Sequence, residues 1–338
     1  MNSDLPLNLN DSNKLTLQIR DLHVGYKVFD GLMHVLNGIN LEVKKGEKIA
    51  IVGESGCGKT TTMRSILRVL PRSARIFSGE ILYEGSDILK MRNKEISYLR
   101  QKCISMIFQD PTASLNPVFT IGQQLKDVIK ISGLVKDKKN RKEKNKKAYE
   151  LAITALQDCQ LPDPERIMRN YPFQLSGGMR QRICIAMALS TARTMLIADE
   201  PTTNIDVTIQ AQILELIDNM VSEREVSLLL ITHSLGVARE VSDRIVVMYG
   251  GDIMESCISS RLFQNPLHPY TIGLLDAIPK LTGNKDMKEI PGKMVSYFDP
   301  PDGCRMAGRC SFTKDICRNF KPDLRMVEEG HYVACHII

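Results

Sequence analysis

Hydrophobic and polar positions follow different periods in successive parts of the chain. In the first ninety or so residues apolar side chains alternate with polar ones, as at Leu15, Leu17 and Ile19, and Gly-containing turns separate the runs. This period of two predicts strands joined by turns. Between about 91 and 190, apolar residues recur three and four positions apart, which predicts amphipathic helices.

Two later runs, TMLIADE from Thr194 and VSLLLITH from Val226, are almost continuously apolar. Such runs are typical of strands buried on both faces of a parallel sheet. The segment DRIVVMYGGDIMES predicts two more strands, which turn at Gly250 and Gly251. This order of strands and helices predicts an α/β protein.

After about residue 260 the chain becomes rich in proline and loses its regular periods, as in NPLHPY and DPPDGC. We expect this part to form a small irregular region of its own. The predicted organisation is a flexible N-terminus at 1–14, a main domain at 15–260 with a helical subdomain at about 112–190, and a C-terminal region at 261–338.

The composition adds a limit on partners. With 338 residues, 43% of them hydrophobic, the chain can bury a substantial core. The segment Lys136–Lys147 holds eight Lys or Arg against two acids and so accounts for the whole net charge of +6. The balanced remainder lacks the distributed basic surface of a nucleic-acid binder, so no nucleic-acid partner is expected. We predict a solvated helix face with a loop before it; contact with acidic lipid or a partner is the alternative.

The chain also lacks the features of a membrane span or a secretion signal. No run of 18 or more uncharged apolar residues occurs, and the polar N-terminal sequence has no basic-then-apolar order. We therefore expect a soluble, intracellular chain, which can still dock on a membrane protein.

The segment GESGCGKTT lies between an apolar strand, IAIV, and a predicted helix in TMRSILRVL. In this context the pattern predicts a phosphate-binding loop, where backbone N–H groups and the helix N-terminus meet the phosphate charge. We expect Lys59 to reach the β- and γ-phosphates and the Thr60 hydroxyl to bind Mg²⁺. The predicted nucleotide-binding residues of this loop are Gly53, Glu54, Ser55, Gly56, Cys57, Gly58, Lys59, Thr60 and Thr61.

Two adjacent acids end the apolar strand in TMLIADEP, at the position where ligands bind in open α/β sheets. Asp199 is expected to hold Mg²⁺, largely through water, and Glu200 to polarise the water that attacks the γ-phosphate. In isolation the pair would be explained as two solvated acids. Beside a phosphate-binding loop, the catalytic interpretation is favoured.

The segment LSGGMRQR is a second glycine-rich turn before a predicted helix, yet it lacks the lysine of a phosphate-binding loop. Ser176 and the two glycines after it offer N–H donors for phosphate oxygens. With these three motifs the chain resembles the ATP-binding subunits of ABC transporters. The resemblance implies an ABC-type P-loop domain, with an antiparallel β subdomain and a helical subdomain, that binds and hydrolyses ATP with Mg²⁺.

The resemblance also implies that this signature turn acts on the nucleotide of a partner. In the family, two ATP-binding subunits meet head to tail, so that each ATP lies between one chain's phosphate-binding loop and the other chain's signature. The signature residues by this match are Leu175, Ser176, Gly177, Gly178 and Gln181.

Other family elements match single residues. Gln109 in IFQDP resembles the Q-loop glutamine, which senses Mg²⁺ and nucleotide and adjoins the contact with the membrane subunit. His233 in LLITHS resembles the switch histidine, which contacts the γ-phosphate and supports hydrolysis. Tyr26 resembles the aromatic residue that stacks on adenine, with Phe29 as a weaker candidate. The implied catalytic set is Lys59, Glu200 and His233, and the implied Mg²⁺ set is Thr60, Gln109 and Asp199.

The chain departs from the family pattern at two places. Asn204, Ile205 and Asp206 stand where the family usually has an Ala-Leu-Asp turn, so Asp206 is matched to the D-loop aspartate. Ser234 stands where an aspartate often follows the switch histidine. Neither departure removes a group assigned to the chemistry, but both bear on communication between the two nucleotide sites.

Two segments outside these motifs, FQDPTASLNP and HPYTIGLLDAIP, closely resemble the dipeptide and oligopeptide importer ATPases, in particular the D-type subunit. The likeness covers about 15–338. It implies a peripheral ATPase at the cytoplasmic face of the cell membrane that powers import of di- or oligopeptides. The implied partners are a homologous ATPase subunit in a heterodimer, with a homodimer as the alternative, two membrane permease subunits and an extracytoplasmic solute-binding protein.

Alternatives to this function remain. Family relatives carry nickel-metallophore complexes or oligosaccharides, so these are the alternative cargoes. A non-transport ABC ATPase of translation or DNA repair is disfavoured, because this chain has a single ATPase unit with C-terminal cysteines and no inserted zinc module or long coiled coil. A stand-alone nucleotide-binding regulator is the third interpretation.

Four of the nine cysteines crowd into the last 35 or so residues: Cys304, Cys310, Cys317 and Cys335. A reducing cytosol disfavours disulfides, whereas four thiolates suit either zinc or a 4Fe-4S cluster, and tight pairs typical of structural zinc are missing. The D-type resemblance implies the 4Fe-4S cluster. His331 and His336 are spare ligands that we expect to be solvated. The other cysteines, Cys57, Cys103, Cys159, Cys184 and Cys257, are expected to be small hydrophobic residues, with a loop residue beside phosphate as the alternative for Cys57.

Overall fold

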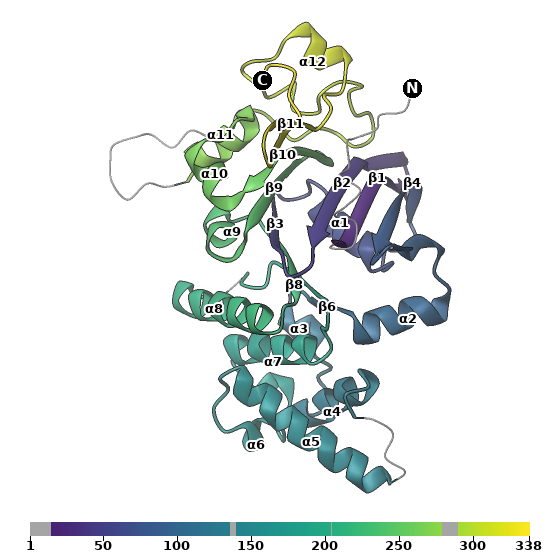
Figure 1. Cartoon of the computed structure of the whole chain (residues 1–338), viewed down its shortest axis with the longest axis vertical. Helices are drawn as coiled ribbons and strands as arrows, with labels where there is room; N and C mark the ends of the chain where they lie inside the picture. Colours follow the sequence, from purple (N-terminus) through teal and green to yellow (C-terminus); the bar gives the residue numbers. More distant parts are fainter. Residues whose placement is uncertain (1–14, 136–139, 204, 279–289) are drawn as a thin grey trace. The chain divides into compact units, whose positions relative to one another are not determined.

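The structure is a computed structural model that describes residues 15–135, 140–203, 205–278 and 290–338. The chain divides into two compact units, one formed by residues 1–90 and 232–338 and the other by residues 91–231 (Figure 1). The predicted flexible N-terminus at 1–14 lies outside the described residues. No helix in the described part of the chain is long and apolar enough to cross a membrane.

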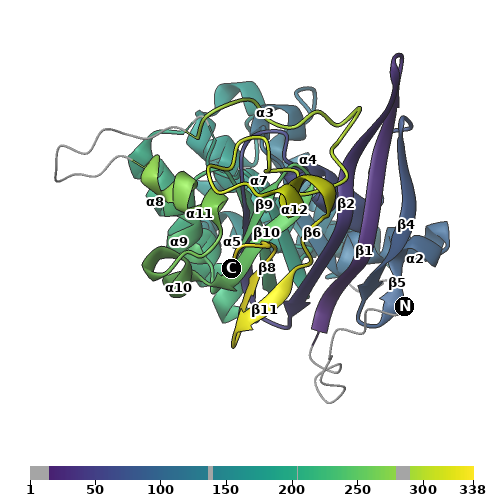
Figure 2. The same cartoon turned by 90° about the horizontal axis from the view of Figure 1, so that it is seen from above.

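The first unit contains an antiparallel sheet in the order β2-β1-β4-β5, whose long strands lie side by side in Figure 2. The strand predicted at the N-terminus is confirmed as β1, where Leu17 and Ile19 bury their side chains, although the polar Thr16 and Gln18 between them are buried as well. The strand bounds are β1 (Leu15–Val28), β2 (Gly31–Lys44), β4 (Ala74–Tyr83) and β5 (Ser86–Asp87), followed by the short helix η2 (Ile88–Lys90).

The other strands of the first unit run in the order β11-β12-β10-β9-β3, with β3 parallel to β9 and the remaining pairs antiparallel. The predicted hairpin is confirmed, since β9 and β10 turn at Gly250 and Gly251, where φ is +55° and +83°. The bounds are β3 (Lys48–Val52), β9 (Arg244–Tyr249), β10 (Asp252–Ile258), β11 (Arg325–Glu328) and β12 (His331–Val333), with helices α1 (Lys59–Ile66), α9 (Leu235–Val241), α10 (Ser259–Gln264), α11 (Pro269–Asp276) and α12 (Asp315–Asn319).

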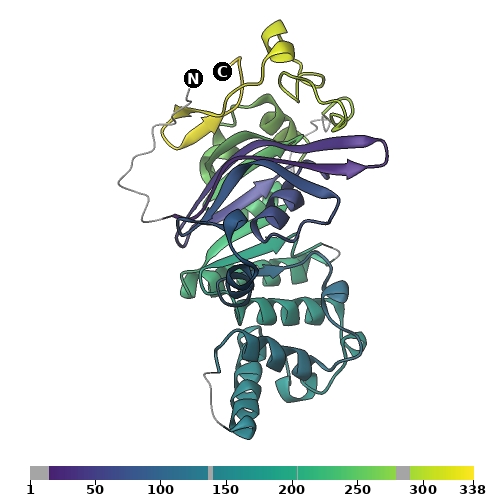
Figure 3. The ribbon, with the colours of Figure 1, turned by 90° about the vertical axis from the view of Figure 1, so that its right-hand side faces the viewer.

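The second unit contains parallel strands in the order β8-β7-β6 and the helices shown in teal in Figure 3. Every residue of β7 and β8 is buried, which confirms the prediction of strands covered on both faces. The bounds are β6 (Ile104–Ile107), β7 (Met195–Asp199), β8 (Ser227–Thr232, its last residue counted with the first unit), α2 (Asn93–Lys102), α3 (Pro111–Ser114), α4 (Ile121–Ile131), α5 (Arg141–Asp158), α6 (Pro164–Ile167), η3 (Pro172–Gln174), α7 (Gly177–Leu189) and α8 (Val207–Glu223).

The basic segment Lys136–Lys147 overlaps the start of α5. From Arg141 onward its side chains are mostly exposed, while the apolar side of α5 buries Ala148, Ala152 and Leu156. Asn140 caps the helix, because its Oδ1 accepts a hydrogen bond from the Lys142 N–H at 3.0 Å. The solvated helix face is thus confirmed for the described part, and the predicted loop at 136–139 lies outside it.

The C-terminal region differs in one respect from its prediction. Although much of it is irregular, β11 and β12 form a hairpin, and β12 pairs with β10 in the first unit. The expectation that His331 is solvated is wrong, because its side chain is fully buried and contacts the Glu255 carboxylate at 2.7 Å. His336 is half-buried, with Nε2 2.9 Å from the Phe320 carbonyl.

Candidate nucleotide site and cysteine site

In the loop between β3 and α1 three glycines, at 53, 56 and 58, have a positive φ that only glycine adopts without strain, and two of them also lie against other strands. Gly53 has φ of +155°, and a Cβ there would lie 2.1 Å from the Met248 carbonyl oxygen. Gly58 has φ of +108°, and a Cβ there would lie 2.7 Å from Leu36. The loop therefore takes this path because side chains are missing where the chain must turn closely against β9 and β2.

Lys59 is held inside this loop. Its side chain is buried, and its Nζ donates hydrogen bonds to the carbonyl oxygens of Gly53 at 2.7 Å and Glu54 at 2.9 Å. No side-chain cap occupies the N-terminus of α1, which starts after Gly58 in the left-handed region. A buried ammonium group and an uncapped helix start are the two features that attract phosphate.

The aromatic candidates for adenine binding differ in placement. The Tyr26 hydroxyl lies 3.0 Å from Thr61 Oγ1, which places this tyrosine at the phosphate-binding loop. Phe29 is fully exposed beyond the end of β1. His233 is exposed directly after β8, and the next residue, Ser234, caps α9 by accepting from the Val237 N–H at 3.3 Å.

In the second unit the structure brings Gln109 and Glu200 together. Gln109 Nε2 donates to Glu200 Oε2 at 2.9 Å, and the Thr203 hydroxyl donates to the same oxygen at 2.9 Å. Glu200 has φ of +46°, an uncommon value for a non-glycine residue, and its N–H donates to the Ile231 carbonyl at 2.8 Å. Such backbone strain is frequent at functional sites. Asp199, the last residue of β7, is buried.

The signature turn has both exposed and buried members. Ser176 and Gly177 are exposed, and Ser176 Oγ accepts from the Met179 N–H at 3.3 Å, which caps α7. Leu175 and Gln181 are buried, and Gln181 Nε2 donates to the Pro201 carbonyl at 2.6 Å. The exposed part of the turn therefore consists of the serine and the first glycine.

Asp206 caps α8, because its Oδ1 accepts from the Ile209 N–H at 3.0 Å. Its side chain is exposed, and Asn204, the first of the three residues that depart from the family turn, lies outside the described residues.

Residues of the C-terminal region contact the phosphate-binding loop, and the sequence carried no signal for them. The Glu54 N–H donates to the Tyr270 hydroxyl at 3.1 Å, and the Tyr297 hydroxyl donates to the Gly56 carbonyl at 2.7 Å. Arg309 Nη1 lies 2.9 Å and 3.1 Å from the two oxygens of the Glu54 carboxylate.

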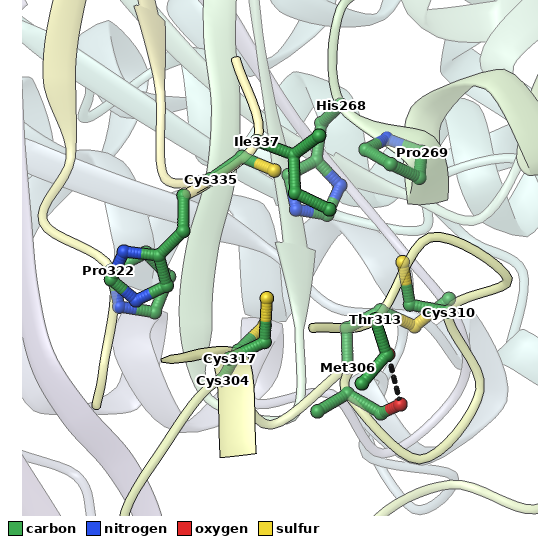
Figure 4. Close-up of a pocket in the computed structure, with 12 residues that line it drawn as sticks. His268, Pro269, Cys304, Met306, Cys310, Thr313, Cys317, Pro322, Cys335 and Ile337 are labelled. Atoms are coloured by element: carbon green, nitrogen blue, oxygen red, sulfur yellow. Dashed lines mark hydrogen bonds between the residues drawn. The ribbon is translucent and has the colours of Figure 1, made fainter. Parts of the chain in front are cut away.

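The four C-terminal cysteines line one small cavity in the first unit (Figure 4). Cys317 is buried and the other three are half-buried. Burial raises the pKa of the Cys304 thiol to about 12 and also raises the pKa of Cys335. Nearby lining residues are His268, Met306, Thr313 and His336. Four sulfur atoms around one cavity form a donor set that suits a metal ion or an iron-sulfur cluster.

Four of the remaining cysteines, Cys57, Cys159, Cys184 and Cys257, are buried, as expected of small hydrophobic residues, while Cys103 is half-buried. Burial raises the pKa of Cys159, Cys184 and Cys257 to about 12, so these thiols stay neutral.

A separate cluster of possible ligands is fully buried: Glu255, Cys257 and His331 have ligand atoms within 4.8 Å of one another. The Glu255 carboxylate already accepts hydrogen bonds from the N–H groups of Leu267 at 2.8 Å and His268 at 2.9 Å, besides its contact with His331. These bonds satisfy the carboxylate. We therefore interpret the cluster as a buried hydrogen-bond network that joins β10, β12 and the start of α11.

The strand, glycine-rich loop and helix around Lys59 define a P-loop nucleotide-binding protein, and family comparisons specify its type. Residues 36–203 match the family described as ABC transporter, and residues 254–317 match the family described as oligopeptide/dipeptide transporter, C-terminal region. A model described as AAA domain, putative AbiEii toxin, Type IV TA system, matches residues 170–239.

Similar proteins extend over almost the whole chain. A probable peptide ABC transporter ATP-binding protein of Sinorhizobium fredii is 42% identical over 96% of both chains, and a dipeptide transport ATP-binding protein of Bacillus subtilis is 43% identical over 94% of this chain and 93% of its own. The dimeric structure of the ATP-binding cassette MJ0796, bound to ADP and Pi after hydrolysis, superposes with a TM-score of 0.62. The two chains are 25% identical, and the match covers 72% of this chain and 98% of that one.

These matches identify the class and then the family. The protein is an ABC-type P-loop ATPase. Within that class, it belongs to the family of ATP-binding proteins of peptide, dipeptide and oligopeptide ABC transporters.

Proposed function

We propose that the chain is the ATP-hydrolysing subunit that powers import of di- or oligopeptides, through ATP-driven head-to-tail dimerisation. The observation that carries this proposal is the buried Lys59 in a glycine-shaped loop before an uncapped helix, within a chain related to peptide-transport ATPases along almost its full length. The loop and the helix offer a binding site for phosphate, and the related proteins are ATP-binding proteins of peptide transporters.

The chemistry is assigned to the chain's own residues. Lys59 binds the β- and γ-phosphates, Thr60 and Asp199 hold Mg²⁺, and Tyr26 stacks on adenine. Glu200 orients and polarises the attacking water, with His233 supporting hydrolysis. The hydrogen bond from Gln109 to Glu200 supports a role for Gln109 in coupling Mg²⁺ and nucleotide to the catalytic carboxylate.

A partner subunit completes the mechanism. The exposed Ser176 and Gly177 support the proposal that the signature donates hydrogen bonds to the partner's ATP, while the buried Leu175 and Gln181 hold the turn in shape. ATP binding then favours the closed pair, and hydrolysis with phosphate release removes that preference. We propose a heterodimer with a homologous ATPase, with a homodimer as the alternative.

Several apolar side chains of the second unit are exposed and are candidates for contact with a membrane subunit. Phe108, which precedes Gln109, is 51% exposed, and Val118, Phe119 and Phe173 are also exposed. Tyr171 stacks on Phe173, with ring centroids 5.7 Å apart. We propose that a coupling element from one of the two permease subunits docks near Gln109 at the cytoplasmic face of the membrane, within a system that includes an extracytoplasmic solute-binding protein.

We further propose that Cys304, Cys310, Cys317 and Cys335 hold a 4Fe-4S cluster that stabilises the C-terminal region. No three of these four described sulfur atoms lie within 4.8 Å of one another. Around a single zinc ion with Zn–S bonds of about 2.3 Å, the sulfurs would be only about 3.8 Å apart. The wider set favours the larger group, whose binding supplies folding free energy to a region short of apolar periodicity.

The metal content tests this assignment. After anaerobic purification we expect brown protein with absorption near about 400 nm, about four irons per chain, and loss of both in Cys317→Ser. Cys159→Ser, which changes a buried cysteine outside the cavity, is the matched control. Colourless protein with one zinc per chain would replace the cluster with zinc at the same residues.

The transport ATPase is tested with Glu200→Gln in the assembled transporter. We expect retained ATP binding, hydrolysis lowered by about a hundredfold or more, and a trapped closed dimer, because the water loses its base. Glu215→Gln, an exposed acid on α8, is the control and leaves hydrolysis unchanged. Undiminished hydrolysis in Glu200→Gln would remove the role given to Glu200, and peptide uptake with the cognate binding protein tests the cargo.

A further inference from the structure

The phosphate-binding loop receives three polar contacts from the C-terminal region of the same unit. Tyr270 accepts from the Glu54 N–H, Tyr297 donates to the Gly56 carbonyl, and Arg309 pairs with the Glu54 carboxylate. These contacts involve both the backbone of the loop and the charged carboxylate of Glu54. The loop's shape is thus set partly by residues more than two hundred positions away.

Arg309 is the most firmly placed of the three. Its side chain is only 8% exposed, and it donates to the carbonyl oxygens of Pro291 at 2.9 Å and Ile290 at 3.0 Å. Its guanidinium also lies over the Tyr249 ring, 5.5 Å from the centroid. Two carbonyls and a ring hold the planar group in place, so that its third nitrogen, Nη1, points at Glu54.

The charge of Glu54 gives this pair a consequence for nucleotide binding. Glu54 lies inside the loop whose backbone and lysine receive phosphates, and its carboxylate is 30% exposed. An unpaired carboxylate there repels a polyanion, whereas a carboxylate paired with Arg309 does not. The Glu54 carbonyl also holds Lys59 Nζ, so a displaced Glu54 moves the ammonium group as well.

Arg309 is also part of the cysteine site. It directly precedes Cys310, and both residues donate their N–H groups to the Met306 carbonyl, at 2.9 Å and 3.0 Å. At the other end of this short turn, the Cys304 N–H donates to the Cys317 carbonyl at 2.7 Å. The positions of the cysteine sulfurs and of the guanidinium therefore depend on the same few backbone turns.

We propose that Arg309 is a positioning residue of the phosphate-binding loop, through which filling of the four-cysteine site raises the affinity for nucleotide. The proposal rests on the proposed function of both sites. It adds a link between them: the filled site fixes the turn from Cys304 to Cys310, the turn fixes Arg309, and Arg309 neutralises and orients Glu54. By linkage, bound nucleotide in turn retains the group held by the cysteines.

A double-mutant cycle with a fluorescent ATP analogue tests the role of Arg309. We expect Arg309→Ala to weaken binding about tenfold in the full chain, since it exposes an unpaired carboxylate to the phosphates. In a Glu54→Gln background the same substitution changes affinity by less than about twofold, because no charge remains to be neutralised. Equal losses in both backgrounds would reduce Arg309 to a structural residue and overturn the proposal.

Two variants sharpen this cycle. Arg309→Lys retains the charge and is expected to recover most of the affinity, leaving a loss of about threefold. Arg318→Ala removes an exposed arginine that directly follows Cys317, as Arg309 directly precedes Cys310, and is expected to leave the affinity unchanged. A loss in Arg318→Ala as large as in Arg309→Ala would mean that any arginine beside a cysteine has this effect, against the proposal.

The link to the cysteine site is tested by stripping iron and zinc from the full chain with a chelator. We expect the stripped wild-type protein to bind the ATP analogue about as weakly as Arg309→Ala, and stripping of Arg309→Ala to cause no further loss. Iron release, followed by absorption, should be slower with the analogue bound in wild type but not in Arg309→Ala. If stripping and Arg309→Ala lowered the affinity additively, or if the rate of iron release were the same with and without the analogue, the link would be overturned.

The outcomes separate this inference from the proposed function. Wild-type protein that fails to bind the analogue would contradict the nucleotide site itself. Wild-type protein that binds it, together with Arg309→Ala that binds it equally well, would contradict only the positioning role of Arg309.

Discussion

The phosphate-binding loop and the signature turn are both glycine-rich segments that open a helix, but the chain surrounds them differently. In the phosphate-binding loop Gly53, Gly58 and Lys59 are buried, and Tyr270, Tyr297 and Arg309 contact it from the C-terminal region. In the signature turn the serine and the first glycine are exposed. The first segment therefore buries its lysine and two of its glycines while Ser55 and Gly56 stay exposed, and the second exposes the serine and glycine that begin its helix.

The helix starts show the same difference. α1 begins after a left-handed Gly58 and has no side-chain cap, which leaves the helix N-terminus for an anion. α7 begins after Ser176, whose hydroxyl already caps the helix. This difference fits the proposed roles of the two segments, in which the loop binds the chain's own nucleotide and the signature serves the nucleotide of a partner.

The largest expected effect separates the glycines of the two segments. Gly53→Ala should lower the free energy of unfolding by about 3 kcal/mol, because its φ is positive and its Cβ would collide with the Met248 carbonyl. Gly177→Ala has no atom within 4 Å of its Cβ, so we expect a change of less than about 1 kcal/mol, in the stabilising direction. Chemical denaturation measures the free energy of unfolding of both variants. Similar losses in the two would contradict the difference between the two glycines.

The next effect concerns the buried lysine. Lys59→Ala should weaken binding of a fluorescent ATP analogue by about a hundredfold, because it removes a charge-assisted donor to the phosphates. Lys45→Ala, an exposed lysine of the same unit, is the control and should bind normally. If Lys59→Ala retained its affinity, the ligand would be bound somewhere other than this loop.

A pH effect is expected in the support of the phosphate-binding loop. Burial lowers the pKa of His268 to about 4, and its Nδ1 accepts from the Tyr270 N–H at 3.0 Å. In the unfolded chain a histidine takes up its proton at about pH 6.5. The stability due to neutral His268 is therefore complete above that pH and is lost as the pH falls toward 4. At pH 5 the expected loss is about 2 kcal/mol.

The control for this prediction is His268→Asn, whose side-chain oxygen can cap α11 without titrating. Its free energy of unfolding should vary less between pH 7 and pH 5 than that of the wild type. An identical pH profile in the two proteins would assign the loss to other groups.

The smallest effect is expected in the signature turn. Ser176→Ala should lower stability by about 1 kcal/mol, because the Met179 N–H loses its cap. The isolated chain should bind the ATP analogue with unchanged affinity, since the signature is proposed to serve the partner's nucleotide. Weaker binding by the isolated variant would place the signature at the chain's own nucleotide instead.

Local patterns predicted much of the fold. The N-terminal strands, the continuously apolar β7 and β8, and the hairpin at Gly250 and Gly251 are all confirmed. These features depend on side chains only a few positions apart, so a short window of the sequence is enough to predict them. The roles given to single residues of the motifs stay predictions, tested by the substitutions above.

His331 shows where this reasoning failed. From the sequence alone we expect a solvated spare ligand at this position, although Tyr332, Val333 and Ala334 follow the histidine directly. β12 nevertheless pairs with β10, and this pairing carries the imidazole to the buried Glu255. Burial here follows from strand pairing over a separation of 76 residues, which no short window contains.

The sequence by itself therefore predicted the phosphate-binding loop, the acids after β7, the signature and the four cysteines as a possible ligand set, because each prediction depends on residue type and short spacing. Only the tertiary structure decided that the cysteine turn contacts the phosphate-binding loop. The pair of Arg309 and Glu54 joins residues 255 positions apart. The physical reason for this pair is the path of the chain after β10, which brings the buried guanidinium of Arg309 next to Glu54, the one carboxylate inside the phosphate-binding loop.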